Sequence, residues 1–245
     1  MTSPHPELTK QAADVHRRLR SAIPTPRVEL DFDNPWQLLV ATILAAQSTD
    51  KKVNEVTPAL FARFPTPASL ADADPEEVEA IVRPTGFYRN KAEAIMGASR
   101  RIADAHGGRV PRRMAALTAL PGVARKTANV VLGAALRVTT RIVVDTHVKR
   151  VARRLELTVE TDPAKIEQEL CGLFAKRTWI DVGHRLVLHG RYVCQAKKPR
   201  CGRCPLNEIC AAAQAPREDR SWKRRARWEQ RLVESRGAVD AFPPA

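Results

Sequence analysis

LPGVARKTANVVL, at residues 120–132, places a Pro-Gly turn directly before the start of a new helix. Gly122 suits the turn because it has no Cβ to oppose a left-handed backbone. A preceding helix through Met114 and Leu117 completes a helix-hairpin-helix. The unpaired N–H groups of the turn and of the following helix converge on one place, where they suit a phosphate. An ordinary corner between two helices is the alternative interpretation of a Pro-Gly turn taken alone.

Helix signals also fill the rest of the chain. A capping residue followed by proline predicts three helix starts, at Asn34, Asp74 and Asp162. The short β-branched run 142–144 suits a buried connector, and no pair of alternating runs is joined by a hairpin turn. Glycines predicted to lie where a helical pattern stops or turns are Gly86, Gly107, Gly108, Gly122 and Gly133. We therefore expect an all-α fold.

The charge balance indicates an anionic partner. Among 245 residues, 41 Lys and Arg face 27 Asp and Glu, which gives a net charge of +14. Such an excess favours nucleic acid as the partner. The N-terminus lacks the pattern of a signal peptide, and no apolar run has the length of a membrane span. We expect a cytoplasmic protein with no membrane partner.

Four of the five cysteines crowd into one short stretch, with six, two and five residues between successive members. They are Cys194, Cys201, Cys204 and Cys210. Four thiolates in this arrangement suit tetrahedral zinc or a [4Fe–4S] cluster, and the spacing does not choose between them. A reducing compartment disfavours the third possibility, two disulfides. Cys171 stands apart in a helical pattern and is expected to pack as a small apolar residue.

Several of these motifs together resemble the endonuclease III family. They are the hairpin, the VDTH segment at 144–147, the LHGRY segment at 188–192 and the four cysteines. The match runs from about Arg17 to Cys210, and the cysteine spacing equals that of the family. By this resemblance the four thiolates hold a [4Fe–4S] cluster.

The resemblance also implies a domain organisation. The family has a two-lobed, all-α helix-hairpin-helix glycosylase fold, with a six-helix barrel lobe and an iron–sulfur cluster lobe. We expect the barrel lobe at residues 28–139, the cluster lobe at residues 1–27 and 140–212, and a basic C-terminal tail at 213–245.

The catalytic residues implied by the resemblance are Lys126 as nucleophile and Asp145 as the catalytic carboxylate. An amine can attack the sugar C1′ as a damaged base leaves, and the resulting Schiff base permits β-elimination. A carboxylate can assist proton transfer and stabilise positive charge on the sugar. Read singly, Lys126 is a phosphate-binding lysine and Asp145 a helix cap.

The resemblance thus predicts a bifunctional DNA glycosylase and AP lyase of base excision repair. Its partner is double-stranded DNA that carries oxidised or ring-saturated pyrimidines or abasic sites, and we expect it to act as a monomer. The alternatives are a monofunctional, adenine-removing glycosylase and a noncatalytic DNA-binding module with a structural metal. Lys126 favours the first of the three, because adenine-removing relatives typically lack a lysine at this position.

Extruding a nucleotide leaves a gap in the duplex, and the resemblance implies which residues fill it. Gln47 lies in LAAQSTD, which is similar to the family segment whose glutamine inserts into DNA. Thr85 and Phe87 lie in TGFY, which matches the second inserting loop, usually Ile-Gly-Leu-Tyr. Phe87 can act as a wedge by stacking, whereas Thr85 is a poorer wedge.

Further DNA contacts are expected from the hairpin and from the cysteine loop. In the hairpin, Gly122 and Ala124 face the phosphate, although Ala124 stands where the family usually has glycine. Between the first two cysteines, Lys197, Lys198 and Arg200 form a short basic loop that can meet the DNA backbone. Solvated charge is the alternative interpretation of this loop.

Overall fold

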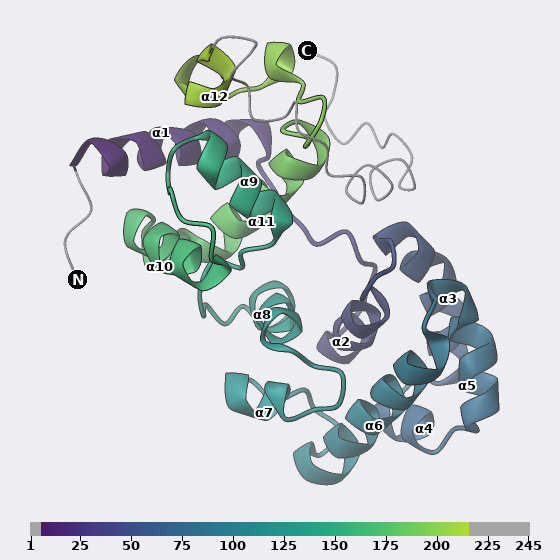
Figure 1. Ribbon diagram of the computed structural model, residues 1–245. Coiled ribbons are helices and arrows are strands. Elements are labelled where there is room, and N and C mark those ends of the chain that lie inside the picture. Colours follow the sequence, from purple (N-terminus) through teal and green to yellow (C-terminus); the bar gives the residue numbers. More distant parts are fainter. Residues whose placement is uncertain (1–5, 216–245) are drawn as a thin grey trace. The chain divides into compact units, whose positions relative to one another are not determined.

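The computed structural model of the protein describes residues 6–215. Within this range the chain is helical and contains no strand, which confirms the expected all-α class (Figure 1). Apart from residues 213–215, the predicted basic tail lies outside the described residues. In the described part of the chain, no helix is long and apolar enough to cross a membrane.

The chain divides into two compact units. One is Val28–Thr140, and the other combines the residues up to Arg27 with those from Arg141 onward. The described residues of each unit enclose a hydrophobic cluster of their own.

The helices of the Val28–Thr140 unit surround one that is buried on nearly every side. They are α2 (Pro35–Leu44), α3 (Asp50–Arg63), α4 (Pro67–Ala71), α5 (Pro75–Val82), the 3₁₀ helix η1 (Arg83–Thr85), α6 (Tyr88–His106), α7 (Met114–Thr118) and α8 (Arg125–Ala134). The central helix is α2, in which Leu38, Leu39 and Val40 are fully buried. Inside this core, Trp36 Nε1 donates a 2.9 Å hydrogen bond to Ser99 Oγ of α6.

Capping residues start the helices where the sequence predicts them. Asn34 Oδ1 accepts from Gln37 N at 3.0 Å, and Asp74 Oδ1 accepts from Glu76 N at 3.0 Å. Each cap is followed by a proline. Proline costs nothing there, because an N–H group in the first turn would have no carbonyl partner within the helix. Asp162 repeats the arrangement in the other unit. The three predicted helix starts are therefore confirmed.

The other unit brings the first helix against the last third of the chain. Its helices are α1 (Pro6–Ala22), α9 (Thr146–Arg154), α10 (Pro163–Leu173), η2 (Lys176–Thr178), α11 (Trp179–Tyr192), η3 (Cys201–Arg203), η4 (Asn207–Ile209) and α12 (Ala211–Gln214). Helix α1, purple in Figure 1, packs on α11 and α10. Helices α9 and α11 lie so close that a Cβ on Gly190 would fall 2.8 Å from His147 Cβ.

Two further predictions concern irregular backbone. Residues 142–144 form a non-helical connector with Ile142 fully buried, as the sequence indicates. The prediction for Gly133 is wrong, because this glycine lies inside α8 and is buried there. Helix α8 ends at the next residue, Ala134, with Ala135 as its C-cap. One glycine near a helix end costs only about 1 kcal/mol, so packing overrides it.

Candidate functional site

The hairpin between α7 and α8 presents an exposed turn. Gly122 has φ +69°, and Val123 N donates to Leu120 O at 3.2 Å to close the turn. A Cβ at Gly122 would stand 2.7 Å from Ala94 Cβ of α6, so both the backbone angle and the packing require glycine.

Ala124 is the N-cap of α8 and has no side-chain capping bond. Its φ of −78° lies in the ordinary extended region, so alanine causes no strain at this position. The methyl group is exposed. The first turn of α8 therefore offers an anion its N–H groups and the positive end of the helix dipole.

Lys126 is the second residue of α8 and is exposed. Its amine is thus carried on the first helical turn after Gly122 and Ala124. A phosphate held by the hairpin would lie near this turn, and the Lys126 side chain can extend from there toward the adjacent sugar.

Asp145 is the N-cap of α9. Its Oδ1 accepts hydrogen bonds from His147 N at 2.9 Å and from Val148 N at 2.8 Å. In the described part of the chain Oδ2 has no hydrogen-bond donor. The cap fixes one carboxylate oxygen and leaves the other able to meet a cation or take a proton. Lys126 and Asp145 belong to different units.

The three residues predicted to fill a gap in DNA differ in exposure. Gln47 is exposed in the turn between α2 and α3, with φ +53°. The Phe87 side chain is 65% exposed. Thr85 is buried instead, and its hydroxyl donates to Val82 O at 2.8 Å. Only Gln47 and Phe87 therefore present side chains that can contact DNA directly.

The four clustered cysteines line one cavity in the unit that contains α1 and α9–α12. Cys194, Cys201, Cys204 and Cys210 share it with His189 and Arg154. Among the described residues, no group of three His, Cys, Asp or Glu side chains converges closely enough for one metal ion. Four thiols around one cavity supply the donor set of a [4Fe–4S] cluster.

The electrostatic setting of these thiols also fits a bound cationic centre. Burial, followed by repulsion from the neighbouring cysteines, raises the pKa of the Cys204 thiol to about 12. Burial likewise raises the pKa of Cys210. Thiolates are unfavourable here unless positive charge compensates them, and iron ions supply that charge.

Three groups of the protein face the sulfur atoms. Arg154, at the end of α9, donates from Nη1 to Cys194 Sγ at 3.3 Å, and Leu206 N donates to Cys204 Sγ at 3.4 Å. His189 Nε2 lies 3.6 Å from Cys204 Sγ. Burial, aided by the charge of Arg150, lowers the pKa of His189 to about 4, so the imidazole is neutral at pH 7. This neutral ring therefore lies against the Cys204 sulfur.

Helix α9 also holds the main chain of the cysteine loop. Arg154 donates to Gln195 O at 2.7 Å and to Ala196 O at 2.8 Å. One turn earlier, Arg150 donates to Cys194 O at 2.9 Å and to Gly190 O at 2.8 Å. The same nine-residue helix thus has Asp145 at its N-cap and the cysteine loop at its last turn.

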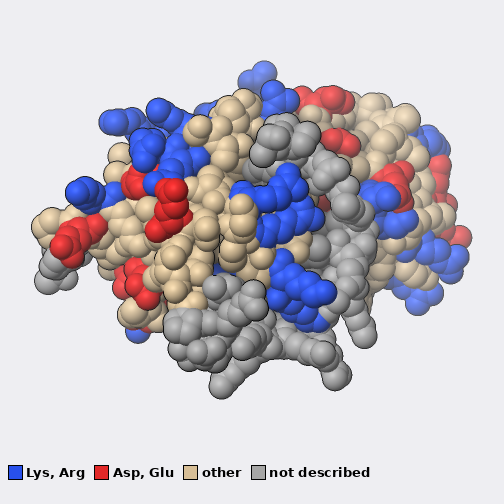
Figure 2. All heavy atoms as spheres, turned by 90° about the horizontal axis from the view of Figure 1, so that it is seen from above, with Lys and Arg blue, Asp and Glu red and all other residues tan. Residues whose placement is uncertain are grey.

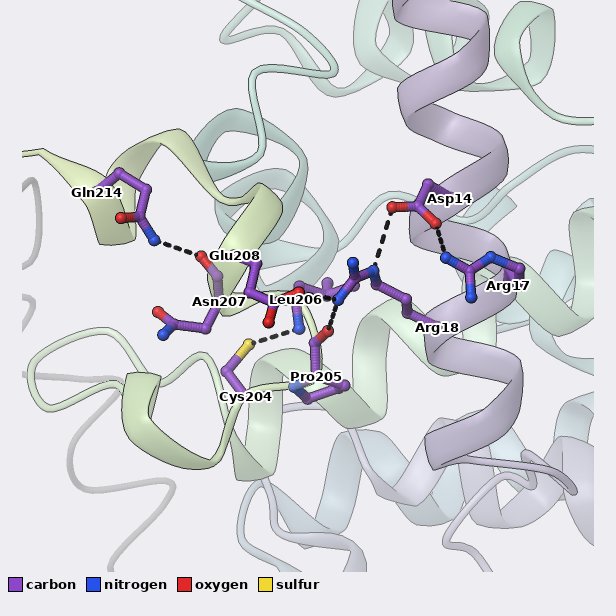
Figure 3. A network of polar contacts seen from close by, with 9 residues as sticks. All are labelled: Asp14, Arg17, Arg18, Cys204, Pro205, Leu206, Asn207, Glu208 and Gln214. Carbon is purple, nitrogen blue, oxygen red and sulfur yellow. Dashed lines mark hydrogen bonds and ion pairs between the residues drawn. The ribbon is translucent and has the colours of Figure 1, made fainter.

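Helix α1 holds the loop at its other end (Figure 3). Arg18 donates to Pro205 O at 3.2 Å and pairs with Glu208 at 2.9 Å, while Asp14 orients Arg18 at 3.1 Å. Because 187 residues separate Arg18 from Pro205, sequence reasoning missed this contact. No local sequence pattern predicts a contact between Arg18 and Pro205.

The basic residues of the loop are only partly exposed. Lys198 and Arg200 are exposed, and Lys197 is half-buried. On the face drawn in Figure 2, Lys and Arg side chains form several separate groups with acidic residues between them. The net charge of +14 therefore remains the observation that favours an anionic partner.

Family models match both the hairpin region and the cysteine loop. Residues 40–176 match the HhH-GPD superfamily of base excision DNA repair proteins. Residues 194–210 match the iron–sulfur binding domain of endonuclease III.

Curated relatives agree with the family models. The chain is 48% identical to endonuclease III of Synechocystis sp. over 84% of its length and 94% of that protein. It is 42% identical to endonuclease III of Escherichia coli over 80% of its length and 93% of that protein.

Solved structures show the same likeness. A non-covalent endonuclease III–DNA complex superposes with a TM-score of 0.77 at 39% identity, covering 83% of this chain and 95% of that one. A trapped covalent endonuclease III–DNA intermediate has a TM-score of 0.77 at 38% identity, with the same coverage. A thermostable thymine-DNA glycosylase shares the fold at 20% identity, with a TM-score of 0.73 and coverage of 83% and 97%.

Proposed function

The chain belongs to the endonuclease III family, and on that premise we propose that Lys126 and Asp145 perform its chemistry. The protein is a bifunctional DNA glycosylase and AP lyase of base excision repair, and it binds DNA. The observation that carries the assignment is the exposed Lys126 on the first turn of α8, directly after the hairpin.

In the first step, the lone pair of Lys126 Nζ attacks the sugar C1′, and the amine gives up a proton. The bond from C1′ to the base breaks, and the base leaves with the electron pair and takes up a proton. Opening of the sugar ring gives a Schiff base between Nζ and C1′. Asp145, fixed through Oδ1 by two backbone N–H groups, stabilises positive charge on the sugar and accepts a proton through Oδ2.

In the second step the strand is cut. Loss of a C2′ proton converts the Schiff base to an enamine. The enamine expels the phosphate on C3′ and leaves a double bond between C2′ and C3′. Water then hydrolyses the Schiff base and restores Lys126. We propose oxidised or ring-saturated pyrimidines as the substrate bases, in keeping with the family.

DNA binding rests on the hairpin and on two wedges. The N–H groups around Gly122 and Ala124 take a phosphate, while Gln47 and Phe87 fill the gap left by the extruded nucleotide. Buried Thr85 shapes the loop rather than contacting DNA. The basic residues that meet the backbone beside the cluster are Lys197, Lys198 and Arg200.

The four cysteines hold the [4Fe–4S] cluster, which cross-links the loop 194–210 when bound. Arg154 and Arg18 hold that loop from α9 and α1. We infer that the protein works as a monomer in the cytoplasm, on the DNA of the nucleoid.

The assignment of Lys126 is tested by borohydride trapping on a duplex with an abasic site. Borohydride reduces the Schiff base to a stable covalent complex, so wild type traps and Lys126→Ala does not. Lys165→Ala is the matched control, because Lys165 is likewise an exposed lysine in the first turn of a helix. Equal trapping by wild type and Lys126→Ala would contradict the proposal.

A further inference from the structure

Lys91, in the first turns of α6, is a buried cation that the reaction does not use. It is 5% exposed, and its Nζ donates a 2.7 Å hydrogen bond to Thr85 O. Burial lowers the pKa of Lys91 to about 8. Within residues 6–215, no carboxylate forms an ion pair with it.

Such a lysine is expensive to bury. An apolar side chain of the same length would avoid the desolvation of the ammonium group and would pack equally well. The position therefore points to a role for the hydrogen bond itself, and the bond ends on the carbonyl of Thr85.

The main chain of Lys91 makes the first helical hydrogen bond of α6, which ends on the other side of the same loop. Lys91 N donates to Phe87 O at 3.1 Å, as its side chain does to Thr85 O. The two bonded carbonyls flank Gly86, whose own N–H donates to Arg83 O at 3.2 Å. One residue thus ties both ends of the short segment 85–87.

The segment needs to be held, because its backbone is unusual. Gly86 has φ +72° and Phe87 has φ +50°, a left-handed conformation that costs a non-glycine residue about 1–2 kcal/mol. Phe87 is nevertheless 65% exposed, so burial of its ring does not hold the loop in place. Of the large apolar residues in the described range, only Phe87 and Val159 are exposed to such an extent.

We propose that Lys91 is a positioning residue that keeps the segment 85–87 in the conformation in which the Phe87 ring projects into solvent. The ring is then ready to enter the base stack of a duplex from which a nucleotide has been extruded. Pre-ordering lowers the entropy cost of inserting the wedge. This inference rests on the proposed role of Phe87 as a wedge.

The test uses Lys91→Met, which keeps length and apolarity but has no donor, and Lys91→Arg, which keeps a donor. Each variant binds duplexes with an abasic-site analogue beside 2-aminopurine, whose fluorescence rises when it unstacks. We expect Lys91→Met to lower the fluorescence rise and to weaken binding to this duplex about tenfold. A tenfold loss is what removal of one charge-assisted hydrogen bond would cause. Lys91→Arg should recover most of both.

Two measurements separate positioning from folding and catalysis. Binding to an undamaged duplex and borohydride trapping on single-stranded abasic DNA need no wedge, so both should match wild type in Lys91→Met. Gly86→Ala provides a second route if Lys91→Met fails to fold. A Cβ at Gly86 meets no atom within 4 Å, so its only effect is strain at φ +72°. It should reproduce the loss of fluorescence.

Phe87→Ala separates the proposed role of Phe87 as a wedge from the proposed role of Lys91 as its positioning residue. If Phe87→Ala leaves the fluorescence rise unchanged, the wedge itself is wrong, and the inference about Lys91 falls with it. If Phe87→Ala abolishes the rise while Lys91→Met and Gly86→Ala behave as wild type, the wedge stands and the role of Lys91 is overturned.

Discussion

Arg154 Nη1 donates a hydrogen bond to the Sγ atom of Cys194 at 3.3 Å, from the last residue of the helix that Asp145 caps. The same guanidinium also bonds two carbonyls of the cysteine loop. A single buried side chain thus contacts both a cluster ligand and the main chain that carries it. Its removal should therefore affect the cluster as well as the stability of the fold.

The first prediction concerns Arg154→Met. It leaves two half-buried carbonyls and one sulfur without this donor, so the protein should lose about 2–4 kcal/mol of stability. Because hydrogen bonds to the sulfurs raise the reduction potential of a cluster, the potential should also fall. Voltammetry and chemical denaturation measure the two effects. Arg153→Met is the matched control, since Arg153 is exposed on the same turn. An unchanged potential would show that the contact to Cys194 has no influence on the cluster.

The second prediction separates the two roles of Asp145. Asp145→Asn keeps an oxygen that can accept from His147 N and Val148 N, so stability should change by less than about 0.5 kcal/mol. Without the carboxylate charge, single-turnover base excision should fall by about two orders of magnitude or more. Asp145→Ala should lose the cap as well, at a cost of about 1 kcal/mol.

A matched control for this pair exists in the same unit. Asp162 caps α10 through Oδ1, which accepts from Ala164 N at 2.9 Å and Lys165 N at 3.0 Å. Asp162→Asn and Asp162→Ala should reproduce the stability changes and leave excision intact. Full excision activity in Asp145→Asn would reduce Asp145 to a structural cap.

The third prediction contrasts the two small residues of the hairpin. Gly122→Ala combines φ +69° with a Cβ 2.7 Å from Ala94 Cβ, so it should lower stability by about 2–4 kcal/mol. Ala124→Gly removes an exposed methyl group from an unstrained N-cap, and affinity for abasic DNA should change less than about threefold. Calorimetry and fluorescence anisotropy measure these effects. A large gain in affinity from Ala124→Gly would mean that the methyl group obstructs the phosphate.

Local signals in the sequence predicted much of this molecule. Three caps followed by proline start helices where expected, since N–H groups at a helix start are satisfied by residues next to them in sequence. The hairpin turn and the grouping of the four cysteines around one cavity follow from short spacings of the same kind.

Contacts between distant segments could not be predicted in this way. Arg154 meets Cys194 across 40 residues, and Arg18 meets Pro205 across 187. No residue near either arginine in the sequence indicates its distant partner. The prediction for Gly133 failed for a related reason. Packing in the core keeps this residue helical, although glycine has a low helix propensity. The burial of Lys91 likewise results from tertiary packing and could not be predicted from the sequence around it.

The last prediction concerns how stability depends on pH through Lys91. Burial lowers the pKa of Lys91 from 10.5 to about 8, so between these values the unfolded chain holds a proton that the folded protein has released. Stability therefore rises with pH across this window, because deprotonation favours the folded state. The full shift corresponds to about 3 kcal/mol, and Lys91→Met abolishes this contribution while leaving those of other groups. Chemical denaturation of wild type and Lys91→Met at pH 7.5 and 9.5 gives the difference in their free energies of unfolding at each pH. The free energy of unfolding of wild type should rise relative to that of Lys91→Met as pH increases, and a constant difference would mean that Lys91 keeps an ordinary pKa in the folded protein.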